Sequence, residues 1–350
     1  MKKLNVNGRL VGDGHPVYLV AEIGSNHASD KAVVKELIDI AADCGFDAVK
    51  FQTYEPAEVF SKKITTTELK INHLYGDRLW WEVARDYILM PREWFAEMFS
   101  YAGEKKLQVF STVHSAADAE FVNQFNPPLF KVASIDVSYT DFLADLAGFN
   151  KPIILSTGMH YLGEIEIAVN TILKQGNRQL ALLHCVSNYP PQPEEVNLNN
   201  ITMLQKTFQL PVGFSNHHPE NFMDVAALTL GACIIEKHVT LNRSMKGPDH
   251  PFALDPPAMR DLVKKVRETE IVLGSYNRVL SETELASRSV TRRSFVARRD
   301  IRKGEILSGN MLKLTRPGTG IHPKYKNQIL GRRVMVDIGE DDVISWDMFE

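Results

Sequence analysis

Two lysines, two histidines and one glutamate stand at or near the ends of short apolar runs, where they could serve one reaction centre. Lys50 lies in AVKFQTY and Lys131 in LFKVAS, each enclosed by apolar neighbours. Glu22 ends VYLVAE, His217 ends PVGFSNH and His238 ends ACIIEKH. Ammonium groups bind phosphate and carboxylate, imidazoles bind divalent cations, and a carboxylate can move a proton. The set is therefore typical of a site for a phosphorylated anion and a metal ion.

Each of these residues also has a purely structural explanation. A lysine can extend to a barrel rim or pair with a carboxylate, and Glu22 could be that partner for Lys50. Ser134, Ser156 and Ser215 end apolar runs, where serine often caps the next helix. Capping and anion binding are compatible, because helix starts present free N–H groups. The combination, rather than any single member, favours a functional site.

Eight apolar runs, each followed by a helical pattern, would position these residues. The runs close at Glu22, Lys50 with Gln52, Thr112, Lys131 with Ser134, Ser156, His184, Ser215 with His217, and Glu236 with His238. This alternation predicts an α/β fold, a parallel (β/α)8 TIM barrel, in which all strands end at one mouth. Since strand residues alternate between faces, Lys50 should point into the barrel if Phe51 faces the helices.

The chain should divide into three parts. Residues 1–274 would form the barrel, residues 275–290 a polar linker, and residues 291–350 a small β-rich domain with short runs punctuated by glycine. Such a domain is near the lower size limit for independent folding. Residues 55–90 interrupt the alternation, and we interpret them as an excursion over the barrel mouth.

Composition narrows the class of protein. The 350 residues carry a net charge of −3, so no overall basic field favours nucleic acid or an anionic membrane. No apolar run reaches the roughly 20 residues that span a bilayer, and MKKLNVNG lacks the apolar core of a signal peptide. Three scattered cysteines, Cys44, Cys185 and Cys233, suit a reducing compartment. A cytoplasmic enzyme is expected.

Several stretches together resemble the N-acetylneuraminate (sialic acid) synthase family of nonulosonate synthases. They run in family order: AEIGSNH (21–27), VKFQTY (49–54), FKVAS (130–134), ILSTGM (154–159), LLHCVSNYPPQPEEVNL (182–198), VGFSNH (212–217), EKHVTLNR (236–243), GPDH (247–250) and RPGTG (316–320). The C-terminal region resembles the antifreeze-like (SAF) domain that these enzymes carry.

The resemblance implies a reaction. Phosphoenolpyruvate would condense with the open-chain aldehyde of an N-acetylated amino sugar, giving a nine-carbon 3-deoxy-2-keto acid and phosphate by C–O cleavage. A divalent metal ion, manganese or magnesium, would be held by His217 and His238 and would polarise the aldehyde. Glu22 would handle the attacking water or the aldehyde proton.

The same resemblance implies roles for the other candidates. The carboxylate and phosphate would be held by Lys50, Lys131, Ser134, Ser156 and Ser215, and the sugar would face Gln52, Asp136, Tyr189 and Asp249. Arg316 of one subunit would reach the N-acetyl group in the partner's barrel, which implies a domain-swapped homodimer. A linker followed by a basic small domain permits that arrangement without requiring it.

Departures from the family pattern lie near the sugar. Asp136 stands where many members carry glutamate, and Asn216 where aspartate is usual. FKVASID and RPGTGIHPKY are more similar to the pseudaminic-acid and spore-coat-polysaccharide branches. The acceptor is therefore left open between N-acetylmannosamine and a diacetamido-hexose.

Two other functions remain open from the residues alone. A Schiff-base aldolase or lyase would use Lys131 or Lys50 as the nucleophile and would need neither metal nor phosphoenolpyruvate. A non-catalytic sugar-binding protein could keep the barrel as a scaffold. The presence of both lysines, both histidines and Glu22 argues against that last function.

Overall fold

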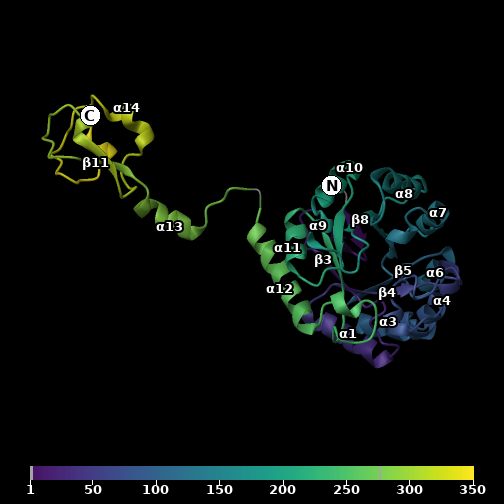
Figure 1. Ribbon diagram of the computed structural model, residues 1–350. Coiled ribbons are helices and arrows are strands. Elements are labelled where there is room, and N and C mark those ends of the chain that lie inside the picture. Colours follow the sequence, from purple (N-terminus) through teal and green to yellow (C-terminus); the bar gives the residue numbers. More distant parts are fainter. Residues whose placement is uncertain (1–2, 276) are drawn as a thin grey trace. The chain divides into compact units, whose positions relative to one another are not determined.

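The computed structural model describes residues 3–275 and 277–350, which fall into two compact units, Met1–Gly274 and Ser275–Glu350. In the first unit, parallel strands close into a barrel in the order β10-β3-β4-β5-β6-β7-β8-β9 (Figure 1). Their bounds are β3 Tyr18–Glu22, β4 Ala48–Thr53, β5 Gln108–Val113, β6 Phe130–Val132, β7 Ile153–Ser156, β8 Leu180–Cys185, β9 Val212–Asn216 and β10 Ile234–His238. The predicted TIM barrel is confirmed.

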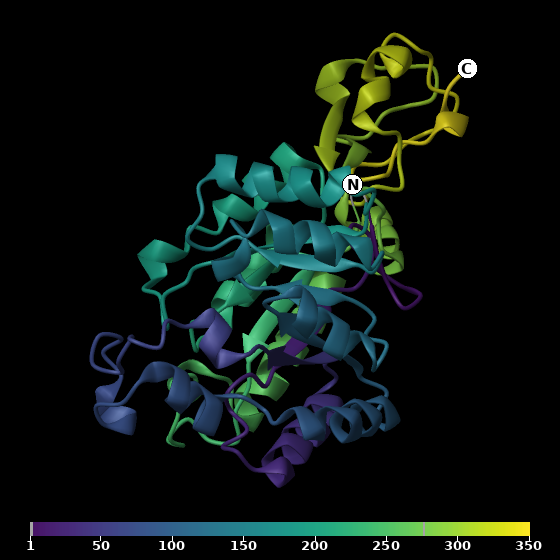
Figure 2. The ribbon, with the colours of Figure 1, turned by 90° about the vertical axis from the view of Figure 1, so that its right-hand side faces the viewer.

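Helices surround the strands (Figure 2). The main ones are α1 Lys31–Cys44, α5 Phe95–Glu104, α6 Ala116–Asn123, α7 Thr140–Gly148, α8 Leu162–Lys174, α10 Asn199–Phe208, α11 Phe222–Thr229 and α12 Pro256–Leu273. Local signals set their ends: Asp30 caps α1, and Gly45 ends it with φ +88°, a left-handed conformation suited to glycine. One apolar layer between the helices and the outer faces of the strands forms the main core.

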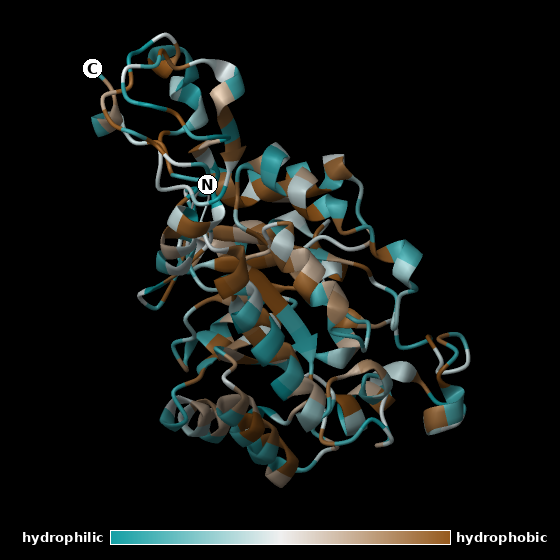
Figure 3. Ribbon diagram, turned by 90° about the vertical axis from the view of Figure 1, so that its left-hand side faces the viewer, coloured by the Kyte–Doolittle hydropathy of each residue, from teal (hydrophilic) through white to brown (hydrophobic). Residues whose placement is uncertain are grey.

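An N-terminal hairpin closes the amino end of the barrel. Its strands, β1 Leu4–Val6 and β2 Arg9–Val11, pair antiparallel. Leu4, Val6 and Val11 are fully buried and share a core cluster with inward-facing strand residues such as Phe110. This apolar cluster forms a floor that closes the amino end of the barrel. The open mouth is therefore at the carboxyl ends of the strands. One strand in Figure 3 passes from brown to a teal arrowhead, so polarity increases toward that mouth.

The excursion over residues 55–90 is built from short helices: α2 Pro56–Val59, α3 Asn72–Tyr75, α4 Trp80–Val83 and the π-helix Ala84–Ile88. It has its own small apolar cluster, which includes Trp80 and Val83. His27, from the loop after β3, contacts the carbonyl of Ile88 at 2.9 Å. This segment is therefore anchored to the loop that follows β3.

The second unit is a compact β-rich domain with a separate core. It contains α13 Glu282–Thr291, β11 Ser294–Ala297, β12 Leu312–Thr315 and α14 Lys326–Ile329. Helix α13 lies largely in the stretch expected to be a linker. A capping box of Ser281 and Glu284 starts this helix, and all its side chains are exposed.

In the described parts of the chain, no helix combines the length and the apolarity that a membrane span requires.

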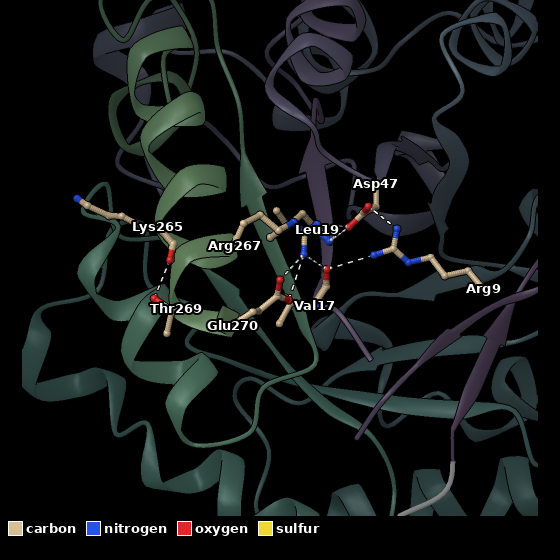
Figure 4. Close-up of polar contacts among 8 residues, drawn as sticks. All are labelled: Arg9, Val17, Leu19, Asp47, Lys265, Arg267, Thr269 and Glu270. Atoms are coloured by element: carbon tan, nitrogen blue, oxygen red, sulfur yellow. Dashed lines mark hydrogen bonds and ion pairs between the residues drawn. The ribbon is translucent and has the colours of Figure 1, made fainter. Parts of the chain in front are cut away.

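A carboxylate joins the last helix to the first strands at the amino end of the barrel (Figure 4). Asp47 Oδ2 accepts hydrogen bonds from the backbone N–H of Leu19 at 2.8 Å and from Arg267 Nη2 of α12 at 3.1 Å. Its other oxygen pairs with Arg9 of the hairpin. One largely buried side chain thus connects β2, β3 and α12. This connection joins the last helix of the barrel to its first strand.

Replacing Asp47 by alanine should lower the free energy of unfolding of the barrel by about 2–3 kcal/mol, because two guanidinium groups and a strand N–H lose their acceptor. Urea denaturation followed by far-UV circular dichroism measures the change. Lys264→Ala is the control, since Lys264 lies 3.9 Å from Glu268 in an exposed pair and should shift stability by less than about 0.5 kcal/mol. Equal effects of the two substitutions would contradict a tie through Asp47.

Candidate active site

The carboxyl ends of four strands bring two lysines and two glutamates together inside the barrel. Lys50 Nζ lies 2.7 Å from Glu22 Oε2 and 3.7 Å from Glu236 Oε1, and Lys131 Nζ lies 3.5 Å from the same Glu236 oxygen. All four residues are at most 4% exposed. Phe51 packs outward near α5, so Lys50 points inward as the alternation predicts. The result is a buried, formally neutral charge cluster of two ammonium groups and two carboxylates.

Glu22 is held on both oxygens. Gln52 Nε2 donates to Oε1 at 2.8 Å, while Lys50 pairs with Oε2. Gly24 lies against this carboxylate with φ +48°, and a Cβ there would stand only 2.7 Å from Glu22 Oε1. Glycine at position 24 is therefore required by both the turn and the close approach.

Glu236 is a site residue to which the sequence pattern gave no role. It lies between Lys131 and Lys50, and Ser215 Oγ donates to Oε1 at 3.1 Å. A usable signal was its position two residues before His238 on one strand, since such residues share a face. Glu236 thus completes the charge cluster from β10.

The environments of the two carboxylates separate their pKa values. Burial raises the pKa of Glu22 to about 7, although Lys50 works in the opposite direction. Burial also opposes the charge on Glu236, but Lys131 and Lys50 outweigh it and lower its pKa to about 2. Near neutral pH, Glu236 is therefore ionised, while Glu22 can both take and give a proton. A pair of carboxylates with such different pKa values is typical of sites that carry out acid–base catalysis.

The pKa values of the two lysines are shifted in opposite directions. Burial lowers the pKa of Lys131, against the influence of Glu236. For Lys50, burial works to lower the pKa, but Glu22 and Glu236 together raise it. Thr112 Oγ1 accepts a hydrogen bond from Lys50 at 2.8 Å. Lys50 is accordingly a firmly charged ammonium group.

The two predicted metal-binding histidines lie side by side, with ring centroids 5.4 Å apart. His217 Nδ1 donates to the carbonyl of Val186 at 3.0 Å, which leaves its Nε2 as an acceptor. Burial, reinforced by His238, lowers the pKa of His217 to about 3, and burial with Lys50 does the same for His238. The ring of Tyr189 lies 4.2 Å from that of His217. Both imidazoles are therefore neutral, as metal ligands must be.

The pair fits a divalent cation with open coordination positions. The buried Nδ1 of His238 makes no hydrogen bond in the structure and lies 3.5 Å from Asp249 Oδ2. No cluster of three or more His, Cys, Asp or Glu side chains suited to a metal occurs among residues 3–275 and 277–350. The donor set is thus two imidazoles, which leaves coordination positions for water and substrate rather than forming a closed structural site.

The other predicted site residues are placed differently. Ser134 Oγ accepts the Gly158 N–H at 3.0 Å, and Ser156 is buried at the end of β7. Asp136 lies 2.8 Å from His114 Nδ1. Arg316 is exposed within the second unit. Asp136 is therefore paired away from the charge cluster, whereas Gln52 and Ser215 form hydrogen bonds with its two glutamates.

Known proteins share both units. A model of the NeuB family matches residues 37–278, and a SAF domain model matches residues 292–350. The N,N'-diacetyllegionaminic acid synthase of Legionella pneumophila is 34% identical, over 97% of this chain and 96% of that protein. The N-acetylneuraminate-9-phosphate synthase of Homo sapiens is also 34% identical, over 98% and 95%. The crystal structure of the spore coat polysaccharide biosynthesis protein SpsE of Bacillus subtilis is similar with a TM-score of 0.67 and 32% identity, covering 100% of this chain and 99% of that one.

Replacing Glu22 by glutamine should change how stability depends on pH. The pKa of Glu22, raised from 4.5 to about 7, means that its protonated form favours the folded state, and this contribution is lost as the pH rises through 7. Relative to Glu22→Gln, the wild-type free energy of unfolding should fall by about 2 kcal/mol between pH 5 and pH 8. Urea titrations at both pH values measure the difference. The exposed Glu268→Gln is the control, and parallel pH curves for wild type and Glu22→Gln would refute the assignment.

Proposed function

The chain belongs to the NeuB family, and on that basis we propose that it is a nonulosonic acid synthase. It condenses phosphoenolpyruvate with the aldehyde of an N-acetylated amino sugar and releases inorganic phosphate. The observation that carries the proposal is the buried charge cluster of Glu22, Lys50, Lys131 and Glu236 beside two neutral histidines. Relatives named for different sugar acids share this fold, so the proposal names a class of acceptor, N-acetylmannosamine or a diacetamido-hexose.

The cluster suits an anionic phosphate ester. Lys50 and Lys131 supply fixed positive charge in a dry site, where electrostatic stabilisation is strongest. Protonation of Glu22 would leave one unbalanced positive charge in the cluster, which favours an anion. Ser134, Ser156 and Ser215 are buried at or just beyond the carboxyl ends of β6, β7 and β9, and they would donate to the carboxylate and phosphate oxygens.

The proposed chemistry conserves all atoms. The enol carbon of phosphoenolpyruvate attacks the aldehyde carbon, and the aldehyde oxygen takes a proton. Water adds to the resulting cationic carbon that bears the phosphate, and C–O cleavage releases phosphate and leaves a ketone. Glu22, with its pKa of about 7, can accept the proton of water or supply one to the aldehyde oxygen.

His217 and His238 would hold a manganese or magnesium ion, which supplies Lewis-acid polarisation of the aldehyde when bound. Gln52, Tyr189 and Asp249 would face the sugar, with Asp136 at the edge of the site. Arg316 would reach the N-acetyl group from a partner subunit in a domain-swapped homodimer. Phosphoenolpyruvate is a cytosolic metabolite, so the proposal places the enzyme in the cytoplasm.

Phosphate release tests the proposal directly. Phosphoenolpyruvate and manganese are supplied with N-acetylmannosamine or with diacetamido-hexoses, with and without chelator. We expect release that requires one sugar and disappears with chelator. Borohydride trapping with pyruvate runs in parallel, because the lowered pKa of Lys131 also suits a Schiff-base lyase. A trapped adduct without any phosphate release would overturn the synthase assignment.

His238→Ala should reduce kcat/KM by at least about a thousandfold, the effect expected when several kcal/mol of metal-ion catalysis are lost. Circular dichroism should show an intact fold. The control is His184→Gln, because His184 is equally buried but contacts the Val196 carbonyl at 2.6 Å and stacks on Phe214. Normal turnover in His238→Ala would exclude the metal assignment.

A further inference from the structure

Strand β10 carries polar side chains on both faces at its carboxyl end, which is unusual for a strand buried on both sides. Glu236 and His238 face the barrel interior, while Lys237 between them faces the helices and is 1% exposed. On the neighbouring strand β9, Asn216 is the direct register partner of Lys237 and is 2% exposed. Two polar residues therefore lie behind the wall that holds the histidine pair.

The two side chains meet a buried carboxylate on α11. Asn216 Nδ2 donates to Asp224 Oδ1 at 2.9 Å, and Lys237 Nζ lies 3.3 Å from Asp224 Oδ2. Asp224 is fully buried. We call Asn216, Asp224 and Lys237 the outer triad.

The outer triad also forms hydrogen bonds with the backbone next to His217. Lys237 Nζ donates to the His218 carbonyl at 2.5 Å, and Asn216 Oδ1 accepts the His218 N–H at 2.8 Å. The peptide groups before and after the His218 Cα are thus both hydrogen-bonded to the outer triad. His218 follows His217 and Lys237 precedes His238, so this network lies directly next to both histidines in the chain.

We propose that the outer triad is a positioning device that sets the spacing and direction of the His217 and His238 rings for a divalent cation. The inference rests on the proposed function only in assuming that the pair binds a metal. Burying a charged pair and an amide costs free energy, and such groups can be retained because they fix a particular local geometry. The geometry fixed here is that of the backbone that carries the two histidines. Groups behind metal ligands commonly change metal affinity by about 10–100-fold.

Two variants test the proposal without leaving an unpaired buried charge. Asn216→Ala removes the acceptor for the His218 N–H, and the double variant Lys237→Met with Asp224→Asn removes the donor to the His218 carbonyl. Isothermal titration with Mn²⁺ alone measures Kd, and the visible spectrum of the Co²⁺-loaded protein reports coordination geometry. We expect Kd to rise about 10–100-fold and the cobalt spectrum to change, with circular dichroism unaltered.

Asn177→Ala is the matched control. Asn177 is a similarly buried asparagine that donates to the Lys151 carbonyl at 2.8 Å, before the start of β8 and remote from the histidines. It should lower the melting temperature without changing Kd. Wild-type Kd and spectrum in the folded Asn216→Ala and double variants would overturn the positioning role alone. Absence of Mn²⁺ binding by the wild type would overturn the metal site and this inference together.

Discussion

Charge balance inside a dry barrel is the constraint on which the functional site depends. An isolated buried ammonium or carboxylate costs several kcal/mol, so each must find a partner. The partners here come from four strands, β3, β4, β6 and β10, and they meet only when the barrel closes in the observed register. The closed barrel therefore assembles the charge cluster, and protonation of Glu22, whose pKa burial raises to about 7, leaves one excess positive charge there.

The two ends of the barrel carry different kinds of residues: those at the amino end stabilise the fold, and those at the carboxyl end form the candidate site. At the amino end, the hairpin floor and the Asp47 tie bring together the beginning and the end of the barrel sequence. At the carboxyl end, polar side chains replace apolar ones, and strand β10 even carries them on its outer face. TIM barrels characteristically divide their two ends in this way. The outer triad extends this polarity from the carboxyl ends of β9 and β10 into the helical layer at α11.

Much of this arrangement was predictable from the sequence. Alternation placed Lys50 inside because Phe51 is apolar, and strand spacing brought His217 and His238 together. Glu236 was given no role, although its position two residues before His238 puts both side chains on one face of the strand. Asp47 gave no local signal at all, because its partners Arg9 and Arg267 are far away in sequence. Helix α13 is short and polar, and its capping box is the local signal that marks its start.

The hairpin floor has a kinetic consequence. Because Leu4, Val6 and Val11 seal the amino end, the ligands of the proposed synthase would enter and leave at the carboxyl ends of the strands. A molecule bound against the charge cluster would be unable to leave while a second one was held above it, near the exposed ring of Tyr189. Under the proposed function, binding and release would follow a compulsory order, in which the first ligand to enter is the last to depart.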